Sequence, residues 1–278
     1  MYKLLVTDVD GTLLDSNSRL TQLNKKALKD CIDIGINVML ATGKSINSTM
    51  YIIEELGLKL PQITMGGALV ITPERKVIDA YKIPSKLYLD FVENVRGRGC
   101  ELAVATIDSK IYYQEYTEYM DNITAIGEKI NKTADLKSDY FKDNAVSITI
   151  PITESNPMDA FIRKTYGNKL KIARSGEYFF DILSLDSSKG IALTGLIKEL
   201  GIKKEEVVSF GDSQNDISLF EASGLKIAVR NSYPEILKIA DIVTEENYNS
   251  GLGKAIYKYI LKKDPPMNHK EYAYSEGI

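Results

Sequence analysis

Residues 3–14 read KLLVTDVDGTLL, and this stretch decides the fold. The apolar run at residues 3–7 has the length of a buried strand, and the turn-forming residues 10–12 end it. Side chains two residues apart on a strand point to the same side, so we expect Asp8 and Asp10 to project together from its carboxyl end. Ligands bind at that end of the strands in a doubly wound sheet. The two aspartates therefore mark the first candidate site.

This aspartate pair has two interpretations. Neighbouring carboxylates repel each other, and a pKa rises unless a cation offsets the repulsion, which predicts a divalent metal or a division of roles. Asp-Gly is also a common turn pair, so the same residues can simply begin a turn. Taken alone, the stretch does not decide between them.

The sequence on either side alternates between helix and strand. Apolar residues recur at helical spacing over residues 21–35 and 45–57, and each of these segments ends near a glycine. Short apolar runs at residues 36–41 and 63–65 are typical of strands. This order predicts a parallel sheet with helices on both faces.

The pattern changes near residue 82. Helices predicted at residues 86–96 and 157–166 accompany alternating strands, and the last two strands flank a hairpin-like turn at residues 175–177. Alternating helices and strands then resume from residue 188 to residue 244. We therefore expect an α/β fold: a Rossmann-like, doubly wound core of residues 1–81 and 187–264, an inserted α+β cap of residues 82–186 and a polar tail of residues 265–278.

Composition excludes several classes of protein. The 278 residues are 44% hydrophobic and 26% charged, which argues against a disordered, collagenous or membrane-spanning chain. Lys and Arg total 35 against 38 Asp and Glu, so a formal charge of −3 supplies no general attraction for nucleic acid or anionic lipid. Two carboxylates stand where a secretory signal needs apolar residues, and no segment reaches the ~20 apolar residues of a membrane helix. We expect a cytoplasmic protein.

Counting residue types restricts the chemistry. Cys31 and Cys100 cannot form a disulfide framework, and Cys31 lies in an apolar helical pattern that predicts a buried thiol. The single histidine, His269, excludes histidine-based triads and multi-histidine metal sites. Any reaction must therefore use carboxylates, hydroxyl groups or lysines.

Three further polar segments lie where predicted strands end or predicted helices begin. Thr42 and Gly43 connect a strand to a helix, where a hydroxyl group and backbone amides form an anion cradle. Lys189 lies near the start of a predicted helix, where a positive charge interacts unfavourably with the helix dipole. Its position there is therefore better explained by a function than by helix stability. Residues 211–216, GDSQND, supply oxygen donors suited to Mg²⁺ directly after an apolar strand. Capping turns explain each segment separately, but they do not explain why all of them occur together.

In this order the segments resemble the four motifs of the haloacid dehalogenase superfamily. The matching residues are Asp8-Val-Asp10-Gly11-Thr12, Thr42-Gly43, Lys189 and Gly211-Asp212-Ser213-Gln214-Asn215-Asp216. The insert between Thr42 and Lys189 resembles the large α/β (C2-type) cap of Cof-type members. The resemblance extends from about residue 1 to residue 262.

The resemblance implies a Mg²⁺-dependent phosphatase acting on a small phosphate-ester substrate, with sugar phosphates favoured. Asp8 would be the nucleophile and would carry an aspartyl-phosphate, and Asp10 would act as general acid and then general base. The implied metal ligands are a carboxylate oxygen of Asp8, the backbone carbonyl of Asp10 and Asp212, supported by Asp216 and Asn215. The implied phosphate-binding residues are Thr42, Gly43, Lys189 and Asn215.

Two positions depart from the Cof-type pattern. Lys44 replaces the usual arginine and lacks its planar bidentate fork. Residues 66–68 read Gly-Gly-Ala where Asn-Gly-Ala is common, which removes a polar side chain. Arg174, before the hairpin turn, is a candidate for binding a second anionic group. Lys44 and Arg174 are therefore candidate specificity residues.

Other functions stay open at this point. A phosphomutase or phosphotransferase would return the phosphoryl group to a sugar hydroxyl, and a regulatory protein would bind a phosphorylated metabolite without turnover. A dehalogenase is less favoured because the Mg²⁺-binding set would be idle in that chemistry. The sequence does not distinguish a monomer from a weak dimer.

Overall fold

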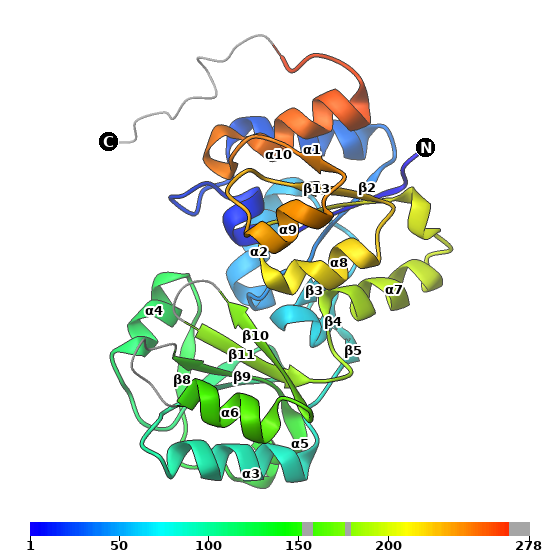
Figure 1. The fold of residues 1–278 in the computed structure, drawn as a ribbon. Coiled ribbons are helices and arrows are strands. Elements are labelled where there is room, and N and C mark those ends of the chain that lie inside the picture. Colours follow the sequence, from blue (N-terminus) through cyan, green and yellow to red (C-terminus); the bar gives the residue numbers. More distant parts are fainter. Residues whose placement is uncertain (152–157, 176–178, 267–278) are drawn as a thin grey trace. The chain divides into compact units, whose positions relative to one another are not determined.

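A computed structural model of the chain describes residues 1–151, 158–175 and 179–266. It divides into two compact units (Figure 1). The first comprises Met1–Leu40, Ile52–Leu60 and Leu196–Ile278, and the second comprises Ala41–Tyr51 and Pro61–Gly195. The core and cap boundaries expected from the sequence stay predictions. The expected polar tail lies mostly outside the described residues, as does most of the turn at residues 175–177.

The first unit contains a five-stranded parallel sheet in the order β14-β13-β12-β1-β2. Its strands are β1 (Leu4–Thr7), β2 (Asn37–Leu40), β12 (Val207–Gly211), β13 (Leu225–Ala228) and β14 (Ile242–Val243). The chain leaves β1 towards β2 on one side and returns to β12 on the other side. The carboxyl ends of β1 and β12 are therefore neighbours at a point where the strand order reverses, which is the ligand-binding position in such sheets.

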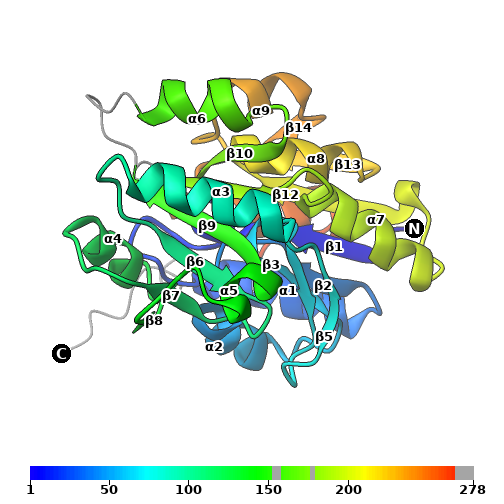
Figure 2. The ribbon, with the colours of Figure 1, turned by 90° about the horizontal axis from the view of Figure 1, so that it is seen from below.

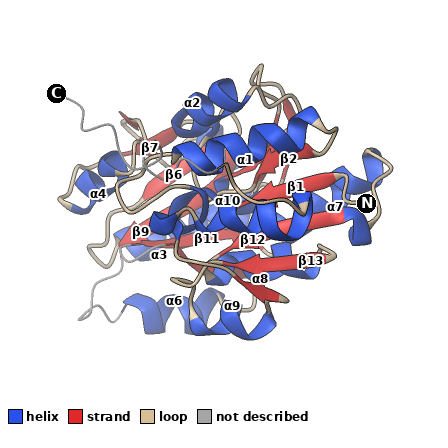
Figure 3. Cartoon of the chain, turned by 90° about the horizontal axis from the view of Figure 1, so that it is seen from above, coloured by secondary structure: helices blue, strands red, loops and turns tan. Residues whose placement is uncertain are grey.

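Helices α1 (Gln22–Asp33) and α10 (Gly251–Ala255) lie side by side across one face of this sheet (Figure 3). Thr21 begins α1 as predicted, because its hydroxyl oxygen accepts a hydrogen bond from the backbone N–H of Asn24. The amide oxygen of Asn24 in turn accepts from the N–H of Gly253 at 2.8 Å. The helical segment from Gly251 to Leu261 was not predicted from the sequence.

The remaining helices of the α/β pattern fall close to their predicted positions. They are α2 (Ile46–Leu56), α7 (Lys189–Glu199), α8 (Ile217–Glu221) and α9 (Pro234–Ile239). Helices α2 and α7 each begin in the second unit and end in the first. The predicted α/β fold with a parallel sheet is confirmed.

The second unit contains a six-stranded sheet in the order β10-β11-β9-β6-β7-β8. Its strands are β6 (Ala103–Thr106), β7 (Ile111–Tyr113), β8 (Ile130–Lys132), β9 (Ala145–Pro151), β10 (Leu170–Ser175) and β11 (Phe179–Ser184), accompanied by helices α3 (Ser85–Arg96), α4 (Tyr119–Ala125), α5 (Asp139–Asn144) and α6 (Met158–Tyr166). Figure 2 looks onto the face that α3 and α6 cover. The predicted strands and the helices α3 and α6 are present, whereas α4, α5 and β8 were not predicted.

Successive side chains along β11 point to opposite faces of this sheet. Phe180 and Ile182 pack in the cluster formed with the helices, whereas Phe179 and Leu183 pack against Met65 and neighbouring residues on the opposite face. This is the two-residue period of a strand that is buried on both faces. The segment that begins at Met65 is thereby held against the sheet.

The segment at residues 62–80 corrects one prediction. Residues 63–65 were expected to form a third strand of the parallel sheet, but β3 (Gln62–Thr64) pairs antiparallel with β4 (Leu69–Ile71), which pairs with β5 (Val77–Ala80). A parallel bridge joins Ile63 to Ala41. Strands of three residues are too short for their alternation to reveal pairing direction, so the hairpin was missed.

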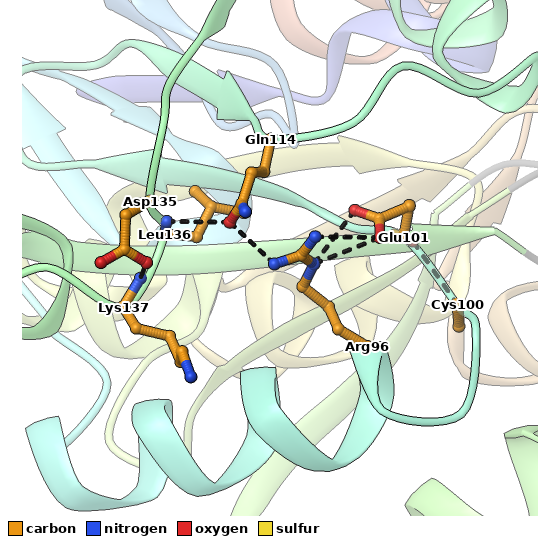
Figure 4. Close-up of polar contacts among 7 residues, drawn as sticks. All are labelled: Arg96, Cys100, Glu101, Gln114, Asp135, Leu136 and Lys137. Atoms are coloured by element: carbon orange, nitrogen blue, oxygen red, sulfur yellow. Dashed lines mark hydrogen bonds and ion pairs between the residues drawn. The ribbon is translucent and has the colours of Figure 1, made fainter.

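A polar network joins the end of α3 to connecting segments of the second unit (Figure 4). Arg96 pairs with Glu101 at 3.1 Å and donates to the side-chain oxygen of Gln114 at 2.7 Å. The same Gln114 oxygen accepts from the backbone N–H of Leu136 at 3.2 Å. Because Leu136 is fully buried, its N–H has no access to water if this acceptor is lost.

We expect Gln114→Ala to lower the free energy of unfolding by about 1–2 kcal/mol, the cost of an unsatisfied buried donor. Urea unfolding monitored by tyrosine fluorescence measures this, since the chain has 17 tyrosines and no tryptophan. Gln114→Glu is the matched control, because it retains an acceptor and faces Arg96. Equal stability of the alanine variant and the wild type would contradict the network's role.

Both cysteines are buried, as predicted for Cys31. Burial raises the pKa of Cys31 to about 12 and the pKa of Cys100 to about 11, so both stay protonated and are poor nucleophiles near neutral pH. In the described part of the chain, no helix combines the length and the apolar character needed to cross a membrane.

Candidate active site

The turn after β1 places the two leading aspartates in different environments. β1 ends at Thr7, as the sequence predicted, so Asp8 and Asp10 follow the strand at its carboxyl end. Asp8 is buried and its N–H donates to the carbonyl of Phe210 at 3.0 Å. The chain then turns through Val9–Leu13, where Gly11 has a φ of 77°, and Asp10 is exposed within this turn. The two carboxyl groups therefore have different access to solvent.

Three carboxylates converge in the first unit. Asp8, Asp212 and Asp216 each place one oxygen within 4.8 Å of the others. Their exposed fractions are 5%, 9% and 0%, so water solvates these groups poorly. The register explains the approach, because Thr7 pairs with Phe210, and Asp8 and Asp212 follow these two residues closely along the chain.

Asp212 is positioned by the turn that follows Asp8. The Thr12 hydroxyl donates to Oδ1 of Asp212 at 2.6 Å. A Cβ at Gly11 would lie 2.6 Å from Oδ2 of the same carboxylate, so only glycine leaves room for it. Residues of the first motif therefore fix the position of the Asp212 carboxylate, although Asp212 lies 200 positions after Thr12 in the sequence.

Asp216 fixes the loop that carries Asp212. Its Oδ2 accepts from the backbone N–H groups of Asp212 and Ser213, both at 3.1 Å. Ser213 caps this turn, and its hydroxyl also donates to the side-chain oxygen of Asn215 at 2.8 Å. Asp216 therefore has the capping function that the sequence allowed as an alternative, in addition to its place among the three carboxylates.

The composition of this carboxylate cluster fits a divalent cation. Three poorly hydrated carboxylates repel one another, and a cation offsets that repulsion. All the donors are oxygens, which suits Mg²⁺. The Asp10 side chain is not one of the three, and the family resemblance implied its backbone carbonyl as the ligand.

The second unit assembles the remaining motif residues. Thr42 is buried; its N–H donates to the carbonyl of Ile63 at 2.9 Å, and its carbonyl accepts from Gly66 at 3.0 Å. Its hydroxyl oxygen accepts from the N–H of Lys44 at 3.1 Å. The hydroxyl proton is therefore directed to some other acceptor, which suits a group that donates to a phosphoryl oxygen.

Lys189 is fully buried at the first residue of α7. Ser188 precedes it and caps the helix, since its hydroxyl oxygen accepts from the N–H of Ile191 at 3.0 Å. A Cβ at Gly67 would lie 2.1 Å from the carbonyl carbon of Ser188 and 2.4 Å from the nitrogen of Lys189. Because Gly66 bonds to Thr42, the glycine pair brings the Thr42 turn and the start of α7 together.

The two candidate specificity residues have different surroundings. Lys44 is 7% exposed and its ammonium group donates to the carbonyl of Ile126. Arg174 is exposed on β10, where it pairs in register with Phe180. Their assignment to substrate recognition stays a prediction.

Sequence reasoning gave no role in the site to three residues that organise it. Thr12 lies in a quoted motif, but its contact with Asp212 was not expected. Asn231 donates to the carbonyl of Gly11 at 2.8 Å, and Glu128 contacts Ser45. The Ser213 to Asp216 spacing is a capping-box signal that could have predicted the role of Asp216.

Comparison with known proteins gives the family. The model of the haloacid dehalogenase-like hydrolases matches residues 5–256, which is most of the chain. The chain belongs to this family. The resemblance stated from the four motifs is thereby confirmed.

Two relatives and one solved structure match this haloacid dehalogenase-like hydrolase along nearly their whole length. Phosphatase YwpJ of Bacillus subtilis (strain 168) is 29% identical over 287 residues, which cover 93% of this chain and 100% of the relative. The phosphoglycolate phosphatase of Methanoculleus marisnigri is 29% identical over 270 residues, covering 93% and 97%. The solved structure of a haloacid dehalogenase-like hydrolase from B. subtilis superimposes with a TM-score of 0.83 at 27% identity, covering 93% and 99%.

Proposed function

We propose that this phosphatase of the haloacid dehalogenase-like family hydrolyses small phosphate monoesters through a phosphorylated Asp8, with Mg²⁺ as cofactor. The observation that carries the proposal is the approach of three nearly buried carboxylate oxygens at the ends of β1 and β12. A capping turn requires no such convergence, whereas transfer of an anionic phosphoryl group to a carboxylate requires a cation between the two negative charges.

The proposed reaction consists of two successive displacements at phosphorus, and residues of the chain take part in both. An oxygen of Asp8 attacks phosphorus, the bond from phosphorus to the ester oxygen breaks, and Asp10 gives its proton to the departing alcohol. Asp10 then accepts a proton from water, whose oxygen forms a new bond to phosphorus as the bond to Asp8 breaks. Inorganic phosphate leaves and both aspartates return to their starting states. The exposure of Asp10 is consistent with proton exchange with solvent.

The other motif residues bind and orient the phosphoryl group. Thr42, the amide of Gly43, Lys189 and Asn215 are proposed to hold its oxygens, as the family resemblance implies. Asp8, Asp212, Asp216 and the carbonyl of Asp10 would hold Mg²⁺, which when bound neutralises negative charge on the phosphoryl group.

We propose sugar phosphates as the substrate class, with specificity set by residues 82–186 acting as a cap that excludes water. The name of the Methanoculleus relative gives phosphoglycolate as its substrate, and phosphoglycolate has no sugar ring. Family membership alone therefore does not determine the leaving group. Lys44 and Arg174 are proposed to contribute to this choice.

Release of inorganic phosphate from p-nitrophenyl phosphate, with Mg²⁺ and without a sugar bisphosphate primer, tests the proposal. We expect turnover, followed by selective activity in a panel of phosphosugars, nucleotides and phosphorylated acids. Turnover only in the presence of a bisphosphate primer would favour a phosphomutase. Phosphate binding without hydrolysis of any ester would favour a regulatory protein.

Gly67→Ala tests the approach of the glycine pair to Lys189. A methyl group there displaces the start of α7, and we expect kcat/KM for p-nitrophenyl phosphate to fall about 100-fold, the usual cost of misplacing a catalytic group by about 1 Å. Gly99→Ala is the control, since Gly99 also has a positive φ of 75° but no atom within 4 Å of its added Cβ. Similar activity in the two variants would show that the contact is unimportant.

A further inference from the structure

Glu128 is a buried carboxylate that the proposed reaction does not use. It is 6% exposed and lies in the turn between α4 and β8. Its Oε1 accepts from the N–H of Ser45 at 2.7 Å and from the Ser48 hydroxyl at 2.7 Å, and its Oε2 accepts from the Ser45 hydroxyl at 2.6 Å. Three donors from one short segment thus converge on a single carboxylate.

These donors belong to the start of α2, which begins at Ile46. The first N–H groups of a helix have no partner within the helix, and a negative charge is favourable beside them. Glu128 fills this position and occupies the N–H of Ser45, although 83 residues separate the two in sequence. Ser45 is therefore committed to a carboxylate of the protein rather than to a ligand.

The turn that carries Glu128 makes a second contact with the same segment. The Lys44 ammonium group donates to the carbonyl of Ile126. Between Ile126 and Glu128, Gly127 has a φ of 89°, which lets both neighbours face residues 44–48. Ser109 adds a hydroxyl oxygen that accepts from the N–H of Ile46 at 3.3 Å.

We propose that Glu128 is a positioning residue for the phosphate-binding turn at Thr42 and Gly43, an inference that rests on the proposed function. Glu128 fixes Ser45, and the adjoining N–H of Lys44 donates to the Thr42 hydroxyl oxygen at 3.1 Å. That bond orients the Thr42 proton. The α4–β8 turn thereby decides whether Thr42 presents its proton to a phosphoryl oxygen, without touching the substrate.

The test compares Glu128→Ala with Glu128→Gln. The dissociation constant of inorganic phosphate is measured by titration calorimetry with Mg²⁺ present, and kcat and KM are measured with p-nitrophenyl phosphate. We expect Glu128→Ala to raise both the dissociation constant and KM about tenfold, the effect of losing charge-assisted hydrogen bonds, with a smaller change in kcat. Glu128→Gln keeps an acceptor for Ser45, so both constants stay within about threefold of wild type. Glu118→Ala removes an exposed carboxylate and serves as control.

Several results would overturn the inference. Unchanged phosphate affinity and KM in a less stable Glu128→Ala protein would leave only a structural role. A glutamine variant as impaired as the alanine variant would show that charge, not positioning, matters. If the alanine variant fails to fold, Ser45→Ala removes one bond to Glu128, and unchanged constants there also contradict the inference. Phosphate binding is measured without turnover, so absence of hydrolysis in the wild type refutes the proposed function and leaves this test intact.

Discussion

We expect Asp8→Asn to reduce turnover by about four orders of magnitude or more, the loss seen when a covalent nucleophile is removed. An amide oxygen carries no charge and cannot form the phosphorylated intermediate. The substitution keeps the shape of the side chain, and the Asp8 N–H that bonds to Phe210 is unaffected. The rate of phosphate release from p-nitrophenyl phosphate measures the effect.

The fold of this variant should survive, for an electrostatic reason. Removing one of three neighbouring charges relieves repulsion in the protein without metal, so thermal unfolding should not begin at a lower temperature than in the wild type. Asp33→Asn, at the exposed end of α1, is the matched control for the substitution itself. Activity of Asp8→Asn within tenfold of wild type would exclude Asp8 as the nucleophile.

The approach of the acidic residues could be predicted from the sequence because of their positions at the ends of predicted strands. Asp8 and Asp212 each follow an apolar run, and parallel strands bring such positions to one edge of a sheet. The pairing of β1 with β12 then places them within reach of each other. The different exposure of Asp8 and Asp10 was not predicted, because it depends on a tight turn at Gly11 that starts directly after Asp8.

Contacts between distant turns could not be predicted in the same way. Glu128 lies in a turn without periodic hydrophobicity, and nothing near it in sequence indicates that Ser45 is its partner. The Thr12 contact with Asp212 spans 200 positions and depends on a glycine that leaves space for a carboxylate. The short strands β4 and β5 were missed for another reason, since pairing of such strands is set by the turn between them.

We expect removal of divalent cations to abolish activity and Mg²⁺ to restore it. Treatment with EDTA followed by dialysis should leave less than about 1% of the phosphate release, because Asp8 cannot approach an anionic phosphoryl group without charge compensation. Mg²⁺ should also raise the unfolding temperature, since it binds the folded carboxylate cluster and not the unfolded chain. Full activity in EDTA would refute the metal requirement.

Two variants test whether this cation binds at Asp212, because they should raise the Mg²⁺ requirement to different extents. Asp212→Asn should raise the Mg²⁺ concentration for half-maximal activity about 100-fold, because a charged oxygen donor is lost from the cluster. Thr12→Val removes only the hydrogen bond to Oδ1 of Asp212, and we expect about a tenfold rise, the range for a group that orients a metal ligand. Asp241→Asn, partly exposed elsewhere in the first unit, should leave the Mg²⁺ requirement unchanged.

A Thr12→Val effect as large as that of Asp212→Asn would mean that the turn itself collapses, whereas no effect in either variant would place the cation elsewhere. The ordering of the three variants therefore separates ligation from orientation.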